Sequence, residues 1–272
     1  MSKATAALLP REHGTWAMLL APWAIACGVA DRLSWEEVLF LGAALAAFLA
    51  YAQVMQHARL GLPGRPDPAM RARTRVRAAL LAALAAGAAL PLVALRGRTA
   101  LVVFAALGGV PVAAGLRLVH ARRERALAGQ VLAAVGLPLT APATYYVARG
   151  VVDGTAVALW GLCVLFFLGA VLYVRLKIQA RARKAALASP VERLRLAGTT
   201  VAVDAAIALG VLGLLRLGGL SPLAGLAFVP AAVQTVAGVA RLDRPVSLKR
   251  LGIVATAHTV VFSGLLIGLA RG

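Results

Sequence analysis

The sequence has 272 residues, 61% of them hydrophobic, and carries a formal net charge of +19. Soluble domains contain only about 45–50% apolar residues. The higher apolar fraction of this chain, with its mean hydropathy of +0.85, excludes a water-soluble domain. The charge does not indicate nucleic-acid binding, because the basic residues are spread over many short connections and are not interleaved with aromatic residues.

Nine apolar stretches follow one another along the chain, separated by short polar connections. A helix needs about 20 residues to cross the ~30 Å hydrocarbon layer, and it satisfies its backbone hydrogen bonds within its own segment, as lipid requires. The sequence therefore predicts an all-α fold, a polytopic transmembrane helix bundle forming a single transmembrane domain over residues 1–272. The helices are expected near 14–30, 37–57, 78–95, 100–119, 126–147, 154–174, 198–216, 221–240 and 251–270.

The basic residues alternate between dense and sparse connections, which predicts the orientation. With the N-terminus inside, the outer segments carry six of the 29 Lys and Arg residues, and the inner segments carry the other 23. An excess of Lys and Arg marks the cytoplasmic side, so we expect the N-terminus inside and the C-terminus outside. Each basic residue near the anionic inner leaflet contributes about 1 kcal/mol of attraction.

The first polar group is the motif Pro-Arg-Glu-His-Gly at residues 10–14, directly before the first helix. Free backbone N–H groups at a helix start can face an anion, and Arg11 and His13 lie beside them. The alternative is an interfacial anchor, in which Arg11 and Trp16 hold the helix at the headgroups and Glu12 interacts with the helix dipole. The sequence leaves both interpretations open.

A few polar side chains lie within the predicted spans, where they cost several kcal/mol unless paired or hydrated, so each is a functional candidate. Gln53 and Gln234 lie near the inner ends of the second and eighth helices. Asp204 lies about 9 Å into the seventh helix and His258 about 12 Å into the ninth, at 1.5 Å per residue. All four lie in the predicted cytoplasmic half, where Asp204 and His258 can form one buried pair.

The sixth predicted helix ends in a second polar stretch, at residues 172–184. Tyr173, Lys177 and Arg181 are spaced by four, so one helix face carries a phenol and two cations, with Arg175 close by. This pattern suits an anionic headgroup or phosphate. The alternative is a stop signal whose long basic side chains reach up to the membrane surface.

Sequence motifs of several enzyme classes are absent. The chain has no GxSxG, Walker loop, HExxH or paired carboxylates at Dxx(x)D spacing, so it lacks the usual groups of hydrolases, NTPases, zinc peptidases and metal-diphosphate enzymes. Cys27 and Cys163 have no CxxC partner. We therefore predict no metal site and no cofactor.

Three segments of the chain carry a family resemblance: PREHGTWAMLLAPW at residues 10–23, FLGAVLYVRLKIQARARK at 167–184 and KRLGIVATAHTVVFSGLL at 249–266. On these the chain resembles the YwiC-like integral membrane proteins over essentially its whole length. The resemblance implies a membrane location, for which we expect the cytoplasmic (inner) membrane of a bacterium, and no particular reaction. The polar positions that it implies are His13, Tyr173, Lys177 or its neighbour Arg175, and His258.

The expected architecture is similar, more distantly, to that of UbiA-type prenyltransferases, which have nine helices and an inner N-terminus. Those enzymes hold Mg²⁺ and a prenyl diphosphate with Asp-rich motifs at the inner ends of helices two and six. Here the corresponding positions read QVMQH (53–57) and YVRLK (173–177), without a carboxylate. The resemblance implies a UbiA-like arrangement, but the missing acids argue against Mg²⁺-dependent transfer, and cations can bind an anionic headgroup directly.

Our main functional hypothesis is a cytoplasm-facing pocket that binds an amphiphile with an anionic or quinone-like head, such as an isoprenoid or another lipid. If the protein is an enzyme, we expect a metal-independent lipid or prenyl-group transfer, with His258, Asp204 and His13 as catalytic residues. The predicted ligand-binding residues are Arg11, Gln53, Tyr173, Arg175, Lys177, Arg181 and Gln234.

Two other functions remain open. Asp204 and His258 can serve a proton-coupled transporter, or the protein can be a non-catalytic membrane assembly protein whose small residues allow close helix packing. The expected partners are membrane lipids, with no nucleic acid. The sequence leaves the oligomeric state open.

Overall fold

The computed structural model describes residues 13–63, 67–123, 126–182, 190–242 and 247–270, and within these ranges it is helical, without strands. The described residues form ten α-helices and two 3₁₀ helices, which confirms the all-α prediction. The elements are α1 (His13–Ala30), α2 (Trp35–Leu60), α3 (Pro68–Ala94), α4 (Ala100–His120), α5 (Leu127–Gly136), η2 (Leu137–Leu139), α6 (Thr140–Arg149), α7 (Gly154–Ala182), α8 (Pro190–Leu217), η4 (Pro222–Phe228), α9 (Val229–Ala240) and α10 (Leu248–Leu269).

These elements form nine crossings of the bundle within the described residues. α5, η2 and α6 make one span, interrupted where Pro138 removes a backbone N–H from the helix, and η4 continues into α9. Within the described ranges, eight spans are long and apolar enough to cross a membrane, and Gly14–Ala30 is a shorter apolar helix. The polytopic helical bundle predicted from the sequence is confirmed.

Two helices begin well before the positions predicted from hydropathy. α3 begins at Pro68, where Asp67 caps the helix by accepting the amide of Met70, and α8 begins at Pro190. Proline is favourable at the first helical position, and arginine is a good helix former. The arginine-rich connections are therefore partly helical extensions of the spans.

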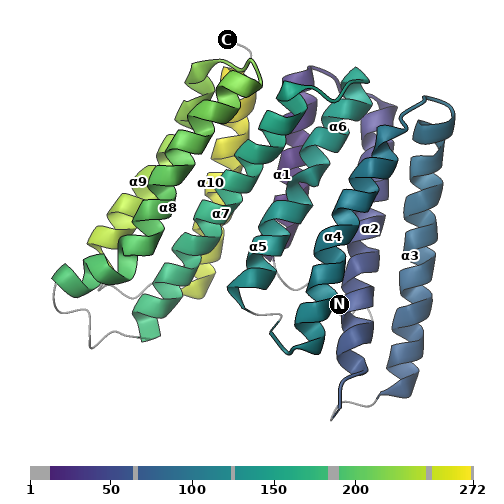
Figure 1. The fold of residues 1–272 in the computed structure, drawn as a ribbon, viewed down its shortest axis with the longest axis horizontal. Helices are drawn as coiled ribbons and strands as arrows, with labels where there is room; N and C mark the ends of the chain where they lie inside the picture. Colours follow the sequence, from purple (N-terminus) through teal and green to yellow (C-terminus); the bar gives the residue numbers. More distant parts are fainter. Residues whose placement is uncertain (1–12, 64–66, 124–125, 183–189, 243–246, 271–272) are drawn as a thin grey trace.

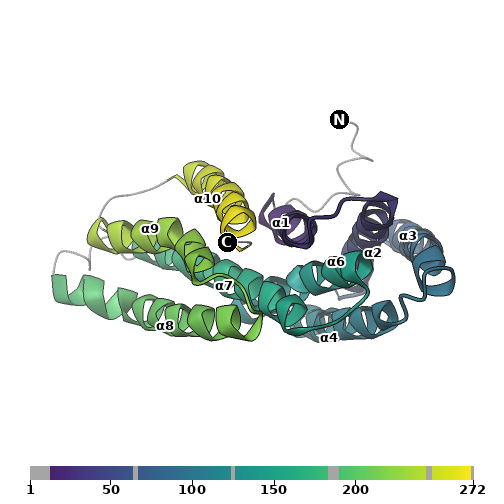
Figure 2. The ribbon, with the colours of Figure 1, turned by 90° about the horizontal axis from the view of Figure 1, so that it is seen from above.

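Successive spans run in opposite directions (Figure 1), so α2, α4, α7 and α9 end on the side of the bundle where α3, α5, α8 and α10 begin. Many of the described arginines lie on this side, in the last turns of α2, α4 and α7 and near the starts of α3 and α8, and we call it the basic end. Seen along the spans, α2, α3 and α4 lie on one side of α1, α6 and α7, and α8, α9 and α10 lie on the other (Figure 2). α3 packs chiefly against α2.

An aromatic cluster lies in the core of the second half of the chain. The ring of Phe166 on α7 stacks on Phe262 of α10 with centroids 4.0 Å apart, and Phe228 of η4 packs edge-on against Phe262 at 5.1 Å. Aromatic pairs of this kind contribute about 0.5–1.5 kcal/mol beyond their buried area. The cluster therefore fixes η4 and α10 against α7.

At the end opposite the basic end, α2 begins with buried carboxylates. The Ser34 hydroxyl accepts the amide of Glu36, and the Glu37 carboxylate accepts the amide of Ser34 at 2.6 Å, which forms a capping box. Glu36 and Glu37 are 2% and 0% exposed. Arg96 and Arg32 form ion pairs with Glu36 at 2.6 and 3.0 Å, and Arg32 also pairs with Glu37 at 3.6 Å.

Candidate functional site

A cavity of about 1460 Å³ lies among α2, α4 and α5, with smaller contributions from α1, α3, η2 and α6. Its lining runs along α2 from Phe40 to Arg59 and along α4 from Leu101 to Val119. At 1.5 Å per residue these stretches are about 28 and 27 Å long, close to the thickness of the hydrocarbon layer. The cavity is therefore long enough to hold an extended hydrocarbon chain.

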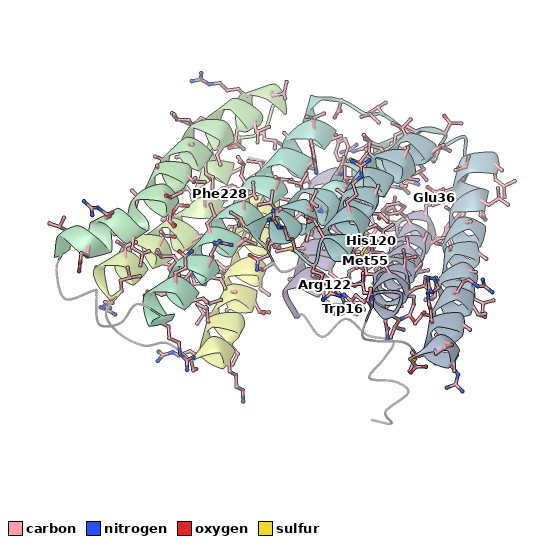
Figure 3. All side chains as sticks on the ribbon, turned by 60° about the horizontal axis from the view of Figure 1, so that its bottom comes forward. Trp16, Glu36, Met55, His120, Arg122 and Phe228 are labelled. Atoms are coloured by element: carbon pink, nitrogen blue, oxygen red, sulfur yellow. The ribbon has the colours of Figure 1, made fainter. Side chains whose placement is uncertain are left out.

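The polar residues of this lining are concentrated toward the basic end. On α2 the lining is apolar from Phe40 to Phe48 and then becomes polar, and α4 contributes apolar residues alone. Figure 3 shows Met55, a lining residue, at the same end of the bundle as His120 and Arg122 and away from Glu36. The cavity is thus amphipathic along its length. Its polar residues toward the basic end are Thr15, Tyr51, Gln53, Gln56, Arg59 and Gln130.

Gln53 is the most deeply buried of these polar residues, with 1% of its surface exposed. Its Oε1 atom has no hydrogen-bond partner among the described residues, whereas Thr140, also in the lining, donates to the carbonyl of Leu19 at 3.0 Å. Leaving a buried polar atom unpaired costs about 1–3 kcal/mol, and nearly all such atoms are paired. A primary amide offers both an acceptor and donors, so Gln53 can bind a hydroxyl or a carbonyl group.

The wall formed by α4 is kept open by glycines. A Cβ atom placed on Gly108 or Gly109 would meet nothing within 4 Å. Nearer the basic end the space narrows, because a Cβ on Gly115 would lie 3.4 Å from the Tyr51 hydroxyl and from the Met55 methyl group. The apolar part of the cavity is therefore the roomier part along α4.

A second group of polar residues joins α7, α8 and α9, and we call it the polar seam: Tyr173, Lys177, Asp204, Gln234 and Thr235. Tyr173 hydrogen-bonds with Gln234, and Asp204 hydrogen-bonds with Thr235. Lys177, which is 8% exposed, donates to the carbonyls of Gly238 at 2.7 Å and Arg241 at 3.2 Å. A lysine commonly satisfies the last carbonyls of a helix in this way.

The seam is closely packed around these bonds. The ring of Tyr173 lies against Gly238 and leaves no room there for a side chain. A Cβ atom on Gly169 of α7 would lie 3.6 Å from an oxygen of Asp204, which places that carboxylate at the α7–α8 contact. The polar groups of the seam therefore find their partners within the protein.

The structure brings four predicted site residues together in the seam: Tyr173, Lys177, Asp204 and Gln234. Of the predicted residues whose side chains are described, Gln53 alone lines the large cavity. The remaining predicted residues are distributed differently. Arg175 is half-buried and Arg181 is exposed on α7, His13 begins α1 with its side chain outside the described part, and Arg11 lies outside the described residues.

Asp204 and His258, the expected buried pair, bond to different partners. The carboxylate of Asp204 is bonded to Thr235. Nδ1 of His258 lies 2.9 Å from the carbonyl of Val254, one turn earlier on the same helix. The bond that would orient the imidazole therefore comes from α10 itself.

Sequence reasoning missed Tyr51, Gln56 and Arg59, which line the cavity together with Gln53. The available signal is their spacing, because Gln56 and Arg59 follow Gln53 in steps of three and residues three apart are neighbours on a helix surface. It also missed the buried carboxylates of Glu36 and Glu37. Their signal is Ser34 with a glutamate three residues later, directly before an apolar run.

Comparison with curated proteins and with solved structures gives no match. A family model described as YwiC-like protein matches residues 9–145, half of the chain. All residues that line the large cavity, from Thr15 to Ala143, fall within the matched region. The chain therefore belongs to the YwiC-like family.

Proposed function

We propose that this polytopic membrane protein binds an amphiphilic molecule, a lipid or an isoprenoid with an anionic or quinone-like head, in the large cavity among α2, α4 and α5. One observation carries the proposal: the polar lining gathers toward the basic end and includes the buried Oε1 of Gln53, which has no hydrogen-bond partner in the part of the chain that the structure describes. A cavity with this distribution matches a molecule that is polar at one end and apolar along the rest of its length.

The ligand's tail lies along the apolar part of the lining, from Phe40 to Phe48 and beside Gly108 and Gly109. Its head lies near Gln53, where the amide can hydrogen-bond with a hydroxyl or a carbonyl. Arg59, at the end of the lining, supplies positive charge for an anionic head. We place this end at the cytoplasmic face of the inner membrane of a bacterium, because the basic residues gather there.

Binding fits the cavity better than transport does. A proton-coupled transporter needs a polar path to the opposite end, and the α2 lining there is apolar. The catalytic roles of His258, Asp204 and His13 stay predictions, whereas this proposal places Tyr173, Lys177 and Gln234 outside the ligand cavity, in the polar seam.

The proposal is tested by native mass spectrometry of the detergent-purified protein, with identification of the lipids that remain bound. The variant Gln53→Met keeps the length of the side chain and removes its polar atoms, and Gln234→Met makes the same change in the polar seam. We expect one bound species in the wild type and in Gln234→Met, and a loss of about tenfold in its affinity in Gln53→Met, equivalent to one buried hydrogen bond. Equal loss in both variants, or no bound species in the wild type, would contradict the proposal.

A second pair of variants tests the apolar part of the cavity. Gly109→Leu fills the space beside α4, whereas Gly87→Leu places the same side chain on α3, where a Cβ also meets nothing within 4 Å and the position is outside the lining. We expect Gly109→Leu to displace the bound species and Gly87→Leu to retain it, with both proteins stably folded. Retention in both variants would place the tail elsewhere.

A further inference from the structure

A second, smaller cavity of about 670 Å³ lies in the hairpin between α2 and α3, at the basic end. It is lined by the last turn of α2, the following turn and the first two turns of α3. The lining includes His57 and Leu60 of α2, whereas the large cavity is lined by Gln53, Gln56 and Arg59 of the same helix. The two cavities therefore have separate sets of lining residues on α2.

A small hydrogen-bond cluster fixes the wall of this cavity. Nδ1 of His57 lies 3.0 Å from the carbonyl of Arg71, and the hydroxyl of buried Thr74 donates to the same carbonyl at 2.8 Å. A carbonyl can only accept, so Nδ1 of His57 is the donor of this bond. The start of α3 is therefore held against the end of α2, and the arginines that follow project from a fixed base.

Two arginines of α3 line the cavity one helical turn apart, Arg71 and Arg75. The guanidinium of Arg71 reaches back over the turn, because a Cβ atom on Gly61 would lie 3.0 Å from its Nη2 atom. Arg73 and Arg77 belong to the same stretch of α3 and are outside the lining. Of the two arginine pairs on this helix, only Arg71 and Arg75 are among the described residues that line the cavity.

Other charged groups around the cavity preserve its positive character. Arg122, from the connection after α4, donates to the carbonyl of the lining residue Pro63 at 3.3 Å and brings a further guanidinium to the rim. Asp67 is the acidic residue of the lining, and its Oδ1 accepts the amide of Met70 at 2.8 Å as the cap of α3. The carboxylate of Asp67 is therefore already hydrogen-bonded to the first turn of α3.

We propose that this cavity binds the phosphoryl group of an anionic phospholipid. A guanidinium binds phosphate oxygens through two parallel hydrogen bonds, and Arg71 and Arg75 lie in the first two turns of α3, where the helix enters the membrane from the basic end. The lining also contains Leu60 and Leu62, which offer apolar contact to the glycerol and upper acyl region of a lipid. Inorganic phosphate has no apolar part that could make this contact.

The test compares two double variants with the same loss of charge: Arg71→Gln with Arg75→Gln, and Arg73→Gln with Arg77→Gln. The delipidated protein in detergent is titrated with phosphatidylglycerol and, separately, with phosphatidylcholine, and binding is read by native mass spectrometry. We expect the wild type to prefer phosphatidylglycerol, the first variant to lose about tenfold in affinity for it, and the second to lose less than about twofold.

Three outcomes would overturn the proposal. Equal loss in the two double variants would mean that the positive surface as a whole attracts the lipid. No preference over phosphatidylcholine in the wild type would mean that the cavity does not recognise an anionic lipid. Displacement of phosphatidylglycerol by millimolar inorganic phosphate would identify free phosphate as the ligand.

Two controls separate this site from folding and from the large cavity. Arg71 and Arg75 are exposed, so the Arg71→Gln, Arg75→Gln protein should keep the thermal stability of the wild type. Arg75→Gln alone should give an intermediate loss of about threefold in affinity for phosphatidylglycerol. The species that depends on Gln53 should stay bound in the Arg71→Gln, Arg75→Gln protein. The two proposals can therefore fail independently.

Discussion

The large cavity and the polar seam bury comparable polar groups and treat them differently. Gln53 in the cavity is 1% exposed and its Oε1 lacks a partner among the described residues, whereas Lys177 in the seam is 8% exposed and donates to two carbonyls. In the seam, Tyr173 and Asp204 are likewise bonded to side chains of α9. Gln53 and Lys177 are both buried, but they differ in the hydrogen-bond partners that the described residues supply.

This difference separates polar groups that hold the fold from those that await a ligand. A buried polar group with partners inside the protein stabilises one packing arrangement, whereas an unpaired one costs free energy until another molecule supplies the bond. We therefore expect substitutions in the seam to reduce stability and substitutions in the cavity to reduce binding.

The largest effect is expected from Glu37→Ala. This variant tests whether the role of a buried polar group depends on its hydrogen-bond and ion-pair partners or on its position in the first half of the chain. The change removes the acceptor of the Ser34 amide and one partner of Arg32, a residue that also donates to the carbonyl of Ala148 on α6 at 2.9 Å. Breaking a buried charged cluster together with a helix cap should lower the free energy of unfolding by about 3 kcal/mol.

Denaturant unfolding in detergent measures this loss, and Glu192→Ala, at an exposed position in the first turn of α8, is the control. The control should stay within about 0.5 kcal/mol of the wild type. The bound lipid should be retained in both proteins. If Glu37→Ala were as stable as Glu192→Ala, the ion pairs and the helix cap would not explain this cluster.

A smaller loss is expected from Lys177→Met, which keeps a long flexible side chain and removes the donor. The carbonyls of Gly238 and Arg241 then lack the Lys177 bond at the end of α9, which should cost about 2 kcal/mol. Thermal unfolding in detergent measures the change, and Arg181→Met, exposed one turn later on α7, is the control. Unchanged stability with loss of the bound lipid would move the ligand site to the seam.

Much of the fold could be predicted from the sequence, because lipid restricts the backbone to helices and hydropathy marks where they cross. The starts of α3 and α8 could not be placed in this way. Hydropathy records the border of the membrane, whereas Pro68 and Pro190 begin helices in the polar region outside it. Helix capping by Asp67 is the local signal that marks the true start of α3.

The candidate site was predictable only in part. Gln53 and Gln234 look alike in the sequence, since each is an amide six or seven residues before an arginine near the end of an apolar helix. Depth in the membrane therefore marks both glutamines as candidate site residues, but it does not predict which residues each side chain contacts. Packing gives Gln234 the hydroxyl of Tyr173 and places Gln53 beside a cavity, and both outcomes depend on contacts between distant segments.

The smallest effect is expected from Asp204→Asn, which changes the charge state of the seam and keeps its hydrogen-bonding capacity. The hydroxyl of Thr235 can donate to the amide oxygen as it does to the carboxylate, so thermal unfolding should show a loss below about 1 kcal/mol. Asp204→Leu removes the partner of Thr235 and should cost more than Asp204→Asn. A proteoliposome assay that found proton-coupled flux in the wild type and none in Asp204→Asn would contradict the structural role, because a residue that only holds α8 against α9 does not need to exchange a proton.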